Sequence, residues 1–479
     1  MKNGLKPDEK PALEYTAQLS SALINGEVKL VVNENCLSVT SVFDAAELPF
    51  TDMTALEFAD YAVTIRATDG SFVFSRMGNW TRPFYDALCT AYNGAVKKAL
   101  FIDDNPIIST RSEYQCAEAD RTFGGVAPAM VYDECVCILP PDTNARRIPM
   151  CFLTDIEKSD FELTLKLAGD KYSLRRMGYD TDSFIMSVEK QMRAMREKTL
   201  KAVRELDPTL SQQQAAEISR LMPLGAAAPM GKLGEISPSF VEMLEKKLGN
   251  SRAANTYKVF CELCDPSQIY IGFKKDETPA AAEGGGISNV LGGLSDKLGG
   301  LDAGDILLFG GDNPVPRDPY MLCLVVPSPD GHSCAVEFAG DKNDAAATFV
   351  YRFDGDFNDF ARRLNLALEA ISFKREVISL SEAELSSPDY VHYRMAVQRN
   401  AALKLVRSAF AGRVIHAGNW RQKLETLWTG GTLPAATRVT PKPVPKAANT
   451  IAAQMRFCTS CGAEQKTGAR FCGKCGAEQ

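Results

Sequence analysis

The residues with the clearest capacity for chemistry lie near the C-terminal end of the chain, where four cysteines form two pairs. Cys458 pairs with Cys461 and Cys472 with Cys475, each pair enclosing two residues. Thiolates at this spacing converge on one cation, and zinc accepts four of them as a tetrahedron at about 2.3 Å. Because sulfur fills all four positions, none is left for water. The sequence therefore predicts one structural Zn²⁺ rather than a catalytic one.

This cysteine segment is too short to have much of a core, so metal binding would supply most of its folding free energy. Phe457 and Phe471 precede the two pairs, a context that favours metal binding over a redox dithiol or disulfides. The segment closely resembles the short zinc-ribbon family found at the termini of many bacterial and archaeal proteins. The resemblance implies a zinc ribbon over residues 456–479.

A second pair with the same spacing, Cys261 and Cys264, has no matching pair downstream. We interpret these two as ordinary thiols at the edge of a strand or helix, in preference to metal or redox ligands. Asp302, Asp305 and Asp312 lie near glycines, where acidic residues usually form turns.

The three histidines, His332, His392 and His416, occur in unrelated segments, which favours surface or core roles over general-base catalysis. No phosphate-binding loop, nucleophile elbow, HExxH or EF-hand pattern is present in the sequence. We therefore predict no catalytic residue, no cofactor-binding residue and no enzyme. An enzyme whose groups converge only in the folded chain is the least favoured alternative.

An internal repeat organises the N-terminal half. Residues 49–78 align without gaps to residues 149–178. A match of this kind predicts two copies of one folded unit. The identical pairs are Pro49/Pro149, Thr54/Thr154, Glu57/Glu157, Asp60/Asp160, Thr64/Thr164, Arg76/Arg176, Met77/Met177 and Gly78/Gly178.

Each copy alternates apolar and polar residues, as in YAVTIRA and FELTLKL, with polar turns between the segments. This period of two predicts antiparallel strands with one buried face. A helix follows, with Phe84 and Leu88 on one face in the first copy and Phe184, Val188 and Met192 on one face in the second. We interpret the shared Arg-Met-Gly structurally: the glycine permits a turn, the methionine packs, and the arginine lies at the strand end.

This order of parts resembles the pleckstrin-homology-like superfold, a strongly bent β-sandwich or barrel closed by its last helix. The resemblance implies such units over 14–105 and 120–206, and it implies binding of peptides, phosphoinositides or other proteins. The first hairpin, VVNENCLSV, carries acid where a lipid-phosphate site needs Lys and Arg. That departure argues against phosphoinositide binding.

Beyond the repeat, the predicted fold class remains α+β, with helical connectors and a third β-rich unit that could be a diverged third copy. The strand signals in that unit include QIYIGF, YMLCLVV and TFVYRF. The predicted segments are a helical connector (207–250), a third β-rich unit (255–375) with a Gly/Leu insertion (280–303), a helical segment (380–430) in which Ser381 and Glu384 form a capping box, a flexible Pro/Ala/Thr linker (431–455) and the zinc ribbon (456–479).

The Gly/Leu insertion places Ile287, Leu291, Leu294, Leu298 and Leu301 at a spacing that would form one apolar stripe on a helix. Its glycines each cost roughly 1 kcal/mol against helix formation. A loop is therefore favoured, with an element that folds on a partner or membrane surface as the alternative.

The composition limits the function classes. The chain of 479 residues is 45% hydrophobic and 24% charged, as expected of a folded protein of about three or four units. A net charge of −6 gives no general attraction for nucleic acid. No long apolar run or signal peptide is recognised, so we expect a cytoplasmic protein.

The favoured prediction is a non-enzymatic adaptor that binds protein partners through its tandem β-domains, with the zinc ribbon as a further contact. Nucleic-acid binding through the basic ribbon and linker is one alternative. Peripheral membrane association through the Gly/Leu insertion is another. The sequence points to no small-molecule substrate.

Overall fold

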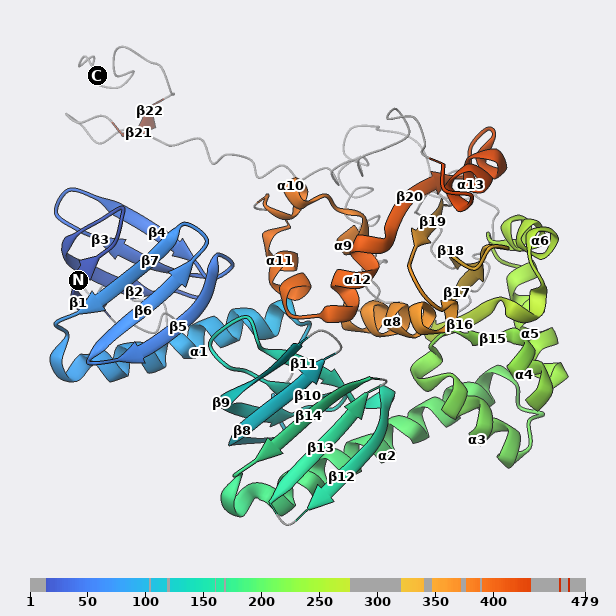
Figure 1. The fold of residues 1–479 in the computed structure, drawn as a ribbon, viewed down its shortest axis with the longest axis horizontal. Coiled ribbons are helices and arrows are strands. Elements are labelled where there is room, and N and C mark those ends of the chain that lie inside the picture. Colours follow the sequence, from blue (N-terminus) through green and yellow to red (C-terminus); the bar gives the residue numbers. More distant parts are fainter. Residues whose placement is uncertain are drawn as a thin grey trace, which may run out of the picture. The chain divides into compact units, whose positions relative to one another are not determined.

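The computed structural model contains mixed helices and antiparallel sheets (Figure 1). It describes residues 14–102, 105–118, 121–159, 161–167, 169–275, 320–339, 347–371, 376–387, 390–431, 456–457 and 464–465. Met1–Thr432 forms one compact unit and Leu433–Gln479 a second. The predicted Gly/Leu insertion, Asp302, Asp305, Asp312 and the linker lie outside the described residues.

The first sheet has seven antiparallel strands in the order β4-β3-β2-β1-β7-β6-β5. Along β1, Tyr15, Ala17 and Leu19 are buried while their neighbours are exposed or half-buried, as the alternating pattern requires. The strands are β1 (Glu14–Ser20), β2 (Gly26–Val32), β3 (Cys36–Thr40), β4 (Ala45–Pro49), β5 (Met53–Ala59), β6 (Ala62–Ala67) and β7 (Gly70–Ser75).

Helix α1 (Thr81–Ala99) follows this sheet after a short 3-10 turn, η1 (Gly78–Trp80). Its residues Phe84, Leu88, Tyr92 and Val96 are spaced four apart and are fully buried in the core formed with the strands. This spacing puts all four on one helical face, which covers the sheet.

The second sheet repeats the first in the order β11-β10-β9-β8-β14-β13-β12, and α2 (Thr181–Leu206) follows it (Figure 1). The predicted repeat of the sheets is thus confirmed, although the sheet begins at Ile108, upstream of the predicted start at 120. Its strands are β8 (Ile108–Glu118), β9 (Arg121–Val131), β10 (Cys135–Ile138), β11 (Arg146–Pro149), β12 (Leu153–Ser159), β13 (Glu162–Leu167) and β14 (Asp170–Arg175).

The repeated Arg-Met-Gly joins the last strand to the helix in the same way in both copies. Arg76 and Arg176 have φ of 61° and 55°, and Gly78 and Gly178 have φ of 55° and 63°. Both methionines are buried. The hydroxyls of Thr81 and Thr181 each donate to the glycine carbonyl at 2.8 Å. The structural interpretation of this motif is confirmed.

The third sheet has the sequential order β15-β16-β17-β18-β19-β20 among its described strands. Among the strands that the structure describes, none closes the sheet as the pairings of β1 with β7 and of β8 with β14 do, so their order differs from that of the seven-stranded sheets. The strands are β15 (Ala228–Pro229), β16 (Tyr270–Lys275), β17 (Tyr320–Pro327), β18 (Ser333–Ala339), β19 (Ala347–Arg352) and β20 (Phe410–Ile415).

Helices surround this third sheet, and one helix and one strand here differ from the predicted segments. Residues near Tyr257 form a helix, α6, rather than the start of the β-rich unit, and the predicted helical segment 380–430 contributes the strand β20. The Ser381–Glu384 capping box is confirmed. The helices are α3 (Gln212–Leu221), α4 (Met230–Ile236), α5 (Pro238–Gly249), α6 (Ala254–Leu263), α8 (Phe357–Ala370), α9 (Glu376–Ser379), α10 (Glu382–Leu385), α11 (Val391–Gln398), α12 (Ala401–Ala409) and α13 (Trp420–Trp428).

Strand β10 belongs to two cores at once. Cys135 and Cys137 are buried in the core of the first sheet, whereas Val136 and Ile138 are buried in the core of the second. The following loop also joins the first sheet, because the amide of Leu56 donates to the carbonyl of Pro141 at 2.9 Å. The two copies therefore pack as one body through β10 and its loop.

A buried guanidinium ties the later helices to this junction. Arg399, which follows α11, is 1% exposed. It donates to the hydroxyl of Tyr92 at 2.5 Å and to the carbonyls of Met395 at 3.1 Å and Asp142 at 3.2 Å. Burial lowers the pKa of Arg399, and no ion pair with a carboxylate is found for it among the described residues. The positive charge of Arg399 is therefore stabilised by neutral hydrogen-bond acceptors.

The Tyr92→Phe variant should therefore be less stable by about 1.5 to 3 kcal/mol, because a buried charged donor loses an acceptor. Urea denaturation would measure the difference. Tyr85→Phe is the matched control on the same helix, since its hydroxyl bonds neutral groups, the carbonyl of Leu56 at 3.4 Å and the thiol of Cys89. If both variants lost the same free energy of unfolding, the proposed contribution of the Arg399–Tyr92 hydrogen bond to stability would be wrong.

Candidate functional site

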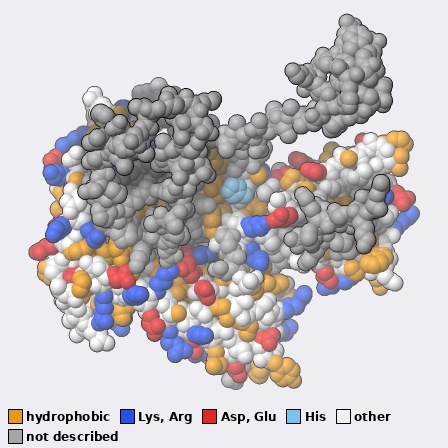
Figure 2. All heavy atoms as spheres, turned by 180° about the vertical axis from the view of Figure 1, so that it is seen from behind, with side chains coloured by type: hydrophobic (Ala, Val, Ile, Leu, Met, Phe, Trp, Pro, Cys, Tyr) orange, Lys and Arg blue, Asp and Glu red, His pale blue; other side chains and the backbone are white. Residues whose placement is uncertain are grey.

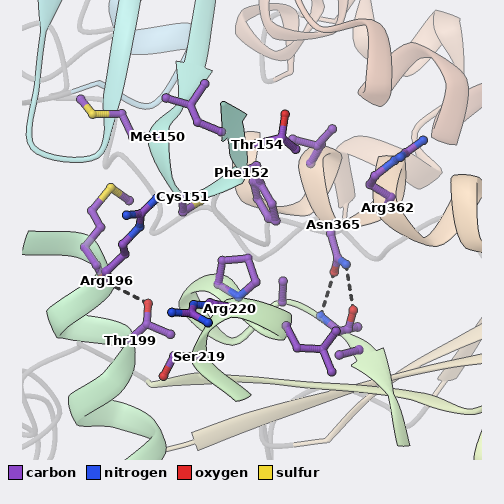
Figure 3. A pocket seen from close by; sticks show the side chains of 18 of the residues that line it. Met150, Cys151, Phe152, Thr154, Arg196, Thr199, Ser219, Arg220, Arg362 and Asn365 are labelled. Carbon is purple, nitrogen blue, oxygen red and sulfur yellow. Dashed lines mark hydrogen bonds between the residues drawn. The ribbon is translucent and has the colours of Figure 1, made fainter. Parts of the chain in front are cut away.

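A cavity of about 1060 Å³ lies within the Met1–Thr432 unit, between the second sheet, α2, α3 and α8 (Figure 3). The 3-10 turns η2 (Met150–Phe152) and η4 (Pro223–Gly225) also line it. Its size is slightly above the range usual for ligand pockets, roughly 300 to 1,000 Å³. We take it as the candidate functional site.

The lining is largely apolar and rich in flexible side chains. Methionine contributes three residues, and thioether side chains adapt to differently shaped ligands. The apolar lining comprises Met150, Cys151, Phe152, Leu153, Leu167, Met192, Met195, Leu200, Ala216, Leu221, Pro223, Ala226, Ala227, Ala228, Pro229 and Leu366.

Basic side chains from four different helices complete the lining. Arg196 comes from α2, Arg220 from α3, Lys232 from α4 and Arg362 from α8, and all four are exposed. Figure 3 shows Arg196 and Arg220 on the α2 and α3 side and Arg362 on the α8 side. Among the described lining residues, Glu197 alone is acidic. The cavity therefore carries an excess of positive charge.

Three of these cations have no ion-pair partner among the residues that the structure describes. Arg362 forms an ion pair with Asp359. Within the part of the chain that the structure describes, no carboxylate forms an ion pair with Arg196, Arg220 or Lys232. An anionic ligand could bind them without first displacing a protein carboxylate.

Hydrogen bonds fix the elements that line the cavity. The Thr199 hydroxyl of α2 donates to the carbonyl of Met195 at 2.9 Å and accepts from the amide of Leu224 at 3.2 Å. The Asn365 amide of α8 accepts from the Ala227 amide at 2.9 Å and donates to the Ala227 carbonyl at 3.0 Å (Figure 3). The segment 224–227 is thereby held from both α2 and α8.

The segment also depends on a glycine that no other residue can replace without strain. Gly225 has φ of 80°, and a Cβ there would lie 1.5 Å from the carbonyl oxygen of Phe273. Leu224 has φ of 50°, which is uncommon for a residue with a side chain. The close approach to β16 maintains this conformation.

The chemistry available in the lining is that of binding. Burial raises the pKa of Cys151 well above its usual value, so its thiol stays protonated and is a weak nucleophile. The described lining residues include no histidine. The distributed cations and the apolar surface can instead hold a ligand that has both negative charges and apolar groups.

Most sequence-predicted site residues lie elsewhere or outside the described residues. Cys458, Cys461, Cys472 and Cys475 lie outside them, as the described tail residues are limited to 456–457 and 464–465. There, β21 (Arg456–Phe457) pairs antiparallel with β22 (Glu464–Gln465), and the first cysteine pair lies between them in the sequence.

Cys261 and Cys264 lie at the end of α6, away from the cavity lining. Both thiols are half-buried. Burial raises the pKa of each, to about 11 for Cys264, so neither is an activated thiolate at neutral pH.

The three histidines do not converge. His332 and His392 are exposed, whereas His416 is half-buried beside the third sheet. Nε2 of His416 lies 2.8 Å from the hydroxyl of Thr348, which donates to the buried carboxylate of Glu337 at 2.7 Å. These contacts join β18, β19 and the end of β20, so the role that they indicate for His416 is structural.

No protein-family model matches the chain, and no curated protein matches it significantly. Within the described ranges, no helix is both long enough and apolar enough to cross a membrane.

Sequence reasoning did not find the cavity, because its lining comes from segments between residues 150 and 366 that carry no shared motif. The sequence predicts Met192 on the apolar face of α2, but the spacing of apolar residues does not indicate that part of this face lines a cavity. The one local signal is Pro223-Leu224-Gly225, where a helix ends and the chain turns.

Gly225→Ala should destabilise the protein by more than about 3 kcal/mol, because the new Cβ collides with the β16 backbone and the residue must keep a positive φ. Thermal and urea unfolding would measure this. Gly234→Ala in α4 is the control, since the nearest atom to its new Cβ is 3.9 Å away. That variant should be neutral or more stable by up to about 1 kcal/mol. A tolerated Gly225→Ala would contradict the close packing.

Proposed function

We propose that this protein is a non-enzymatic adaptor that binds protein partners. The observation that carries the proposal is the apolar cavity whose lining bears Arg196, Arg220 and Lys232, which form no ion pair with any described carboxylate. Such a surface suits a ligand that supplies both apolar side chains and carboxylates. The raised pKa of Cys151 and the absence of histidine from the described lining favour binding over catalysis at this site.

The repeated sheets form the scaffold in this proposal. Each has seven antiparallel strands closed between the first and last strands and is followed by one long helix. This arrangement supports the pleckstrin-homology-like resemblance, in which the fold serves binding and dictates no chemistry of its own. The cavity lies against the second copy, where η2 and α2 contribute to its lining.

The zinc ribbon is the second contact in the proposal. The antiparallel pairing of Arg456 with Gln465 and of Phe457 with Glu464 supports it, because it brings together the two ends of the segment that contains Cys458 and Cys461. Two linked contacts reinforce each other through their effective concentration.

The purified full chain should bind one Zn²⁺, measured by elemental analysis against protein concentration. The paired variant Cys458→Ser with Cys461→Ser should lose it, because two thiolates cannot complete the tetrahedron. Cys261→Ser with Cys264→Ser is the matched control and should retain the full zinc content. Zinc that is absent from the full chain, or lost only in the control, would contradict the ribbon.

The adaptor function is tested by affinity. A partner captured on the full chain, identified by mass spectrometry and purified, should bind the chain as a defined complex in calorimetry. The Cys458→Ser, Cys461→Ser variant should bind the same partner more weakly by about tenfold or more, because one of two linked contacts is lost. If the variant bound the partner with unchanged affinity, the ribbon would not be a contact for that partner. If no captured protein formed a defined complex with the chain, the adaptor function would be contradicted.

Nucleic-acid binding is less well supported. On the face that Figure 2 displays, Lys and Arg side chains are interspersed with Asp and Glu over the described surface. Binding through the basic tail would show affinity that falls steeply with salt concentration. Salt titration of any retained nucleic acid therefore separates the two functions.

A further inference from the structure

We propose that the cavity binds an acidic amphipathic helix presented by a protein partner. This inference rests on the adaptor function and specifies the chemistry of the segment that the adaptor recognises. The ligand would place leucine-like side chains against the apolar lining and carboxylates against Arg196, Arg220 and Lys232.

The distribution of the cations argues for several carboxylates in one ligand. The four basic side chains come from α2, α3, α4 and α8, rather than from one loop or one helix end. Figure 3 shows Arg362 on the opposite side of the cavity from Arg196, so a single carboxylate or headgroup could contact only a part of this set. An acidic helix spreads its charges along its length and can meet cations that lie apart.

The apolar lining argues for side-chain insertion. Met150, Met192 and Met195 provide unbranched thioethers that can rearrange around leucine or phenylalanine side chains. Grooves of this composition accept one apolar face of a helix, with contacts at every third or fourth residue. The charged residues then surround the buried contacts.

The backbone around the cavity argues for a helix over an added strand. Asn365 already pairs with both backbone groups of Ala227, and Ala228 and Pro229 pair with β16. Only Leu153 and Thr154 of β12 contribute to the lining. Little free strand edge therefore faces the cavity, whereas a helical ligand needs none because its own hydrogen bonds are internal.

The test uses the full chain and a fluorescein-labelled peptide of about 18 residues, long enough to form a helix. The peptide contains glutamates with leucines at every third and fourth position. Fluorescence anisotropy should show saturable binding that weakens as salt rises. A peptide with the same leucines and lysine in place of glutamate should bind at least about tenfold more weakly.

The decisive variant is Arg196→Glu with Arg220→Glu, which should weaken binding of the acidic peptide by about tenfold or more. Lys190→Glu with Arg193→Glu is the matched control, because it makes the same change in net charge on exposed α2 residues outside the lining. The control should bind as the natural chain does. Circular dichroism should show that both variants are folded, as all four residues are exposed.

Three results would overturn the inference: no binding of the acidic peptide, equal binding of the lysine peptide, or equal effects of the two paired variants. Complete displacement of the peptide by sodium dodecanoate at equimolar concentration would also overturn it in favour of a simple anionic amphiphile. If a purified partner still binds the chain while the peptide does not, the adaptor function stands and only the ligand class is wrong.

Discussion

Burial of both faces of β10 is the constraint on which the rest of the large unit depends. Strands that alternate strictly between polar and apolar residues can leave one face in water, but Cys135, Val136, Cys137 and Ile138 are all buried. The strand must therefore be covered on both sides, and the first sheet's core provides the second cover. Arg399 extends this junction to α11 and α12 through Tyr92 and Asp142.

The position of α8 follows from a second junction at the same sheet. Arg147 of β11 forms a nearly buried ion pair with Glu369 of α8 at 2.5 Å, and Asn365 of the same helix pairs with Ala227. Removal of one member of a buried pair would leave a charge without compensation, which is costly. These contacts hold α8 beside η2 and η4, and the cavity is the space that the three elements do not fill.

The repeat, the sheets and the long helices could be predicted because each has a local pattern: alternation in YAVTIRA and FELTLKL, and the spacing of Phe184, Val188 and Met192. The start of the second sheet is predicted too late because β8, ISTRSEYQCAE, has polar residues at buried positions, namely Thr110, Ser112 and Glu118, so the apolar alternation typical of a strand is missing. The cavity could not be predicted, since the approach of Asn365 to Ala227 depends on packing between distant segments, and neither residue carries a sequence signal.

Basic residues in the interior and basic residues that line the cavity differ in how their charges are compensated. Where a basic residue of the second sheet is buried, it has a partner: Arg146 makes a bidentate contact with Glu118 at 2.5 and 3.0 Å, and Arg147 pairs with Glu369. Water compensates Arg196 and Arg220, which are exposed beside an apolar surface. A ligand that covers this surface removes that water, so it must bring its own carboxylates or leave the cations without compensation. The more apolar area a ligand buries here, the more water it removes from these cations, and the more strongly an acidic ligand is favoured.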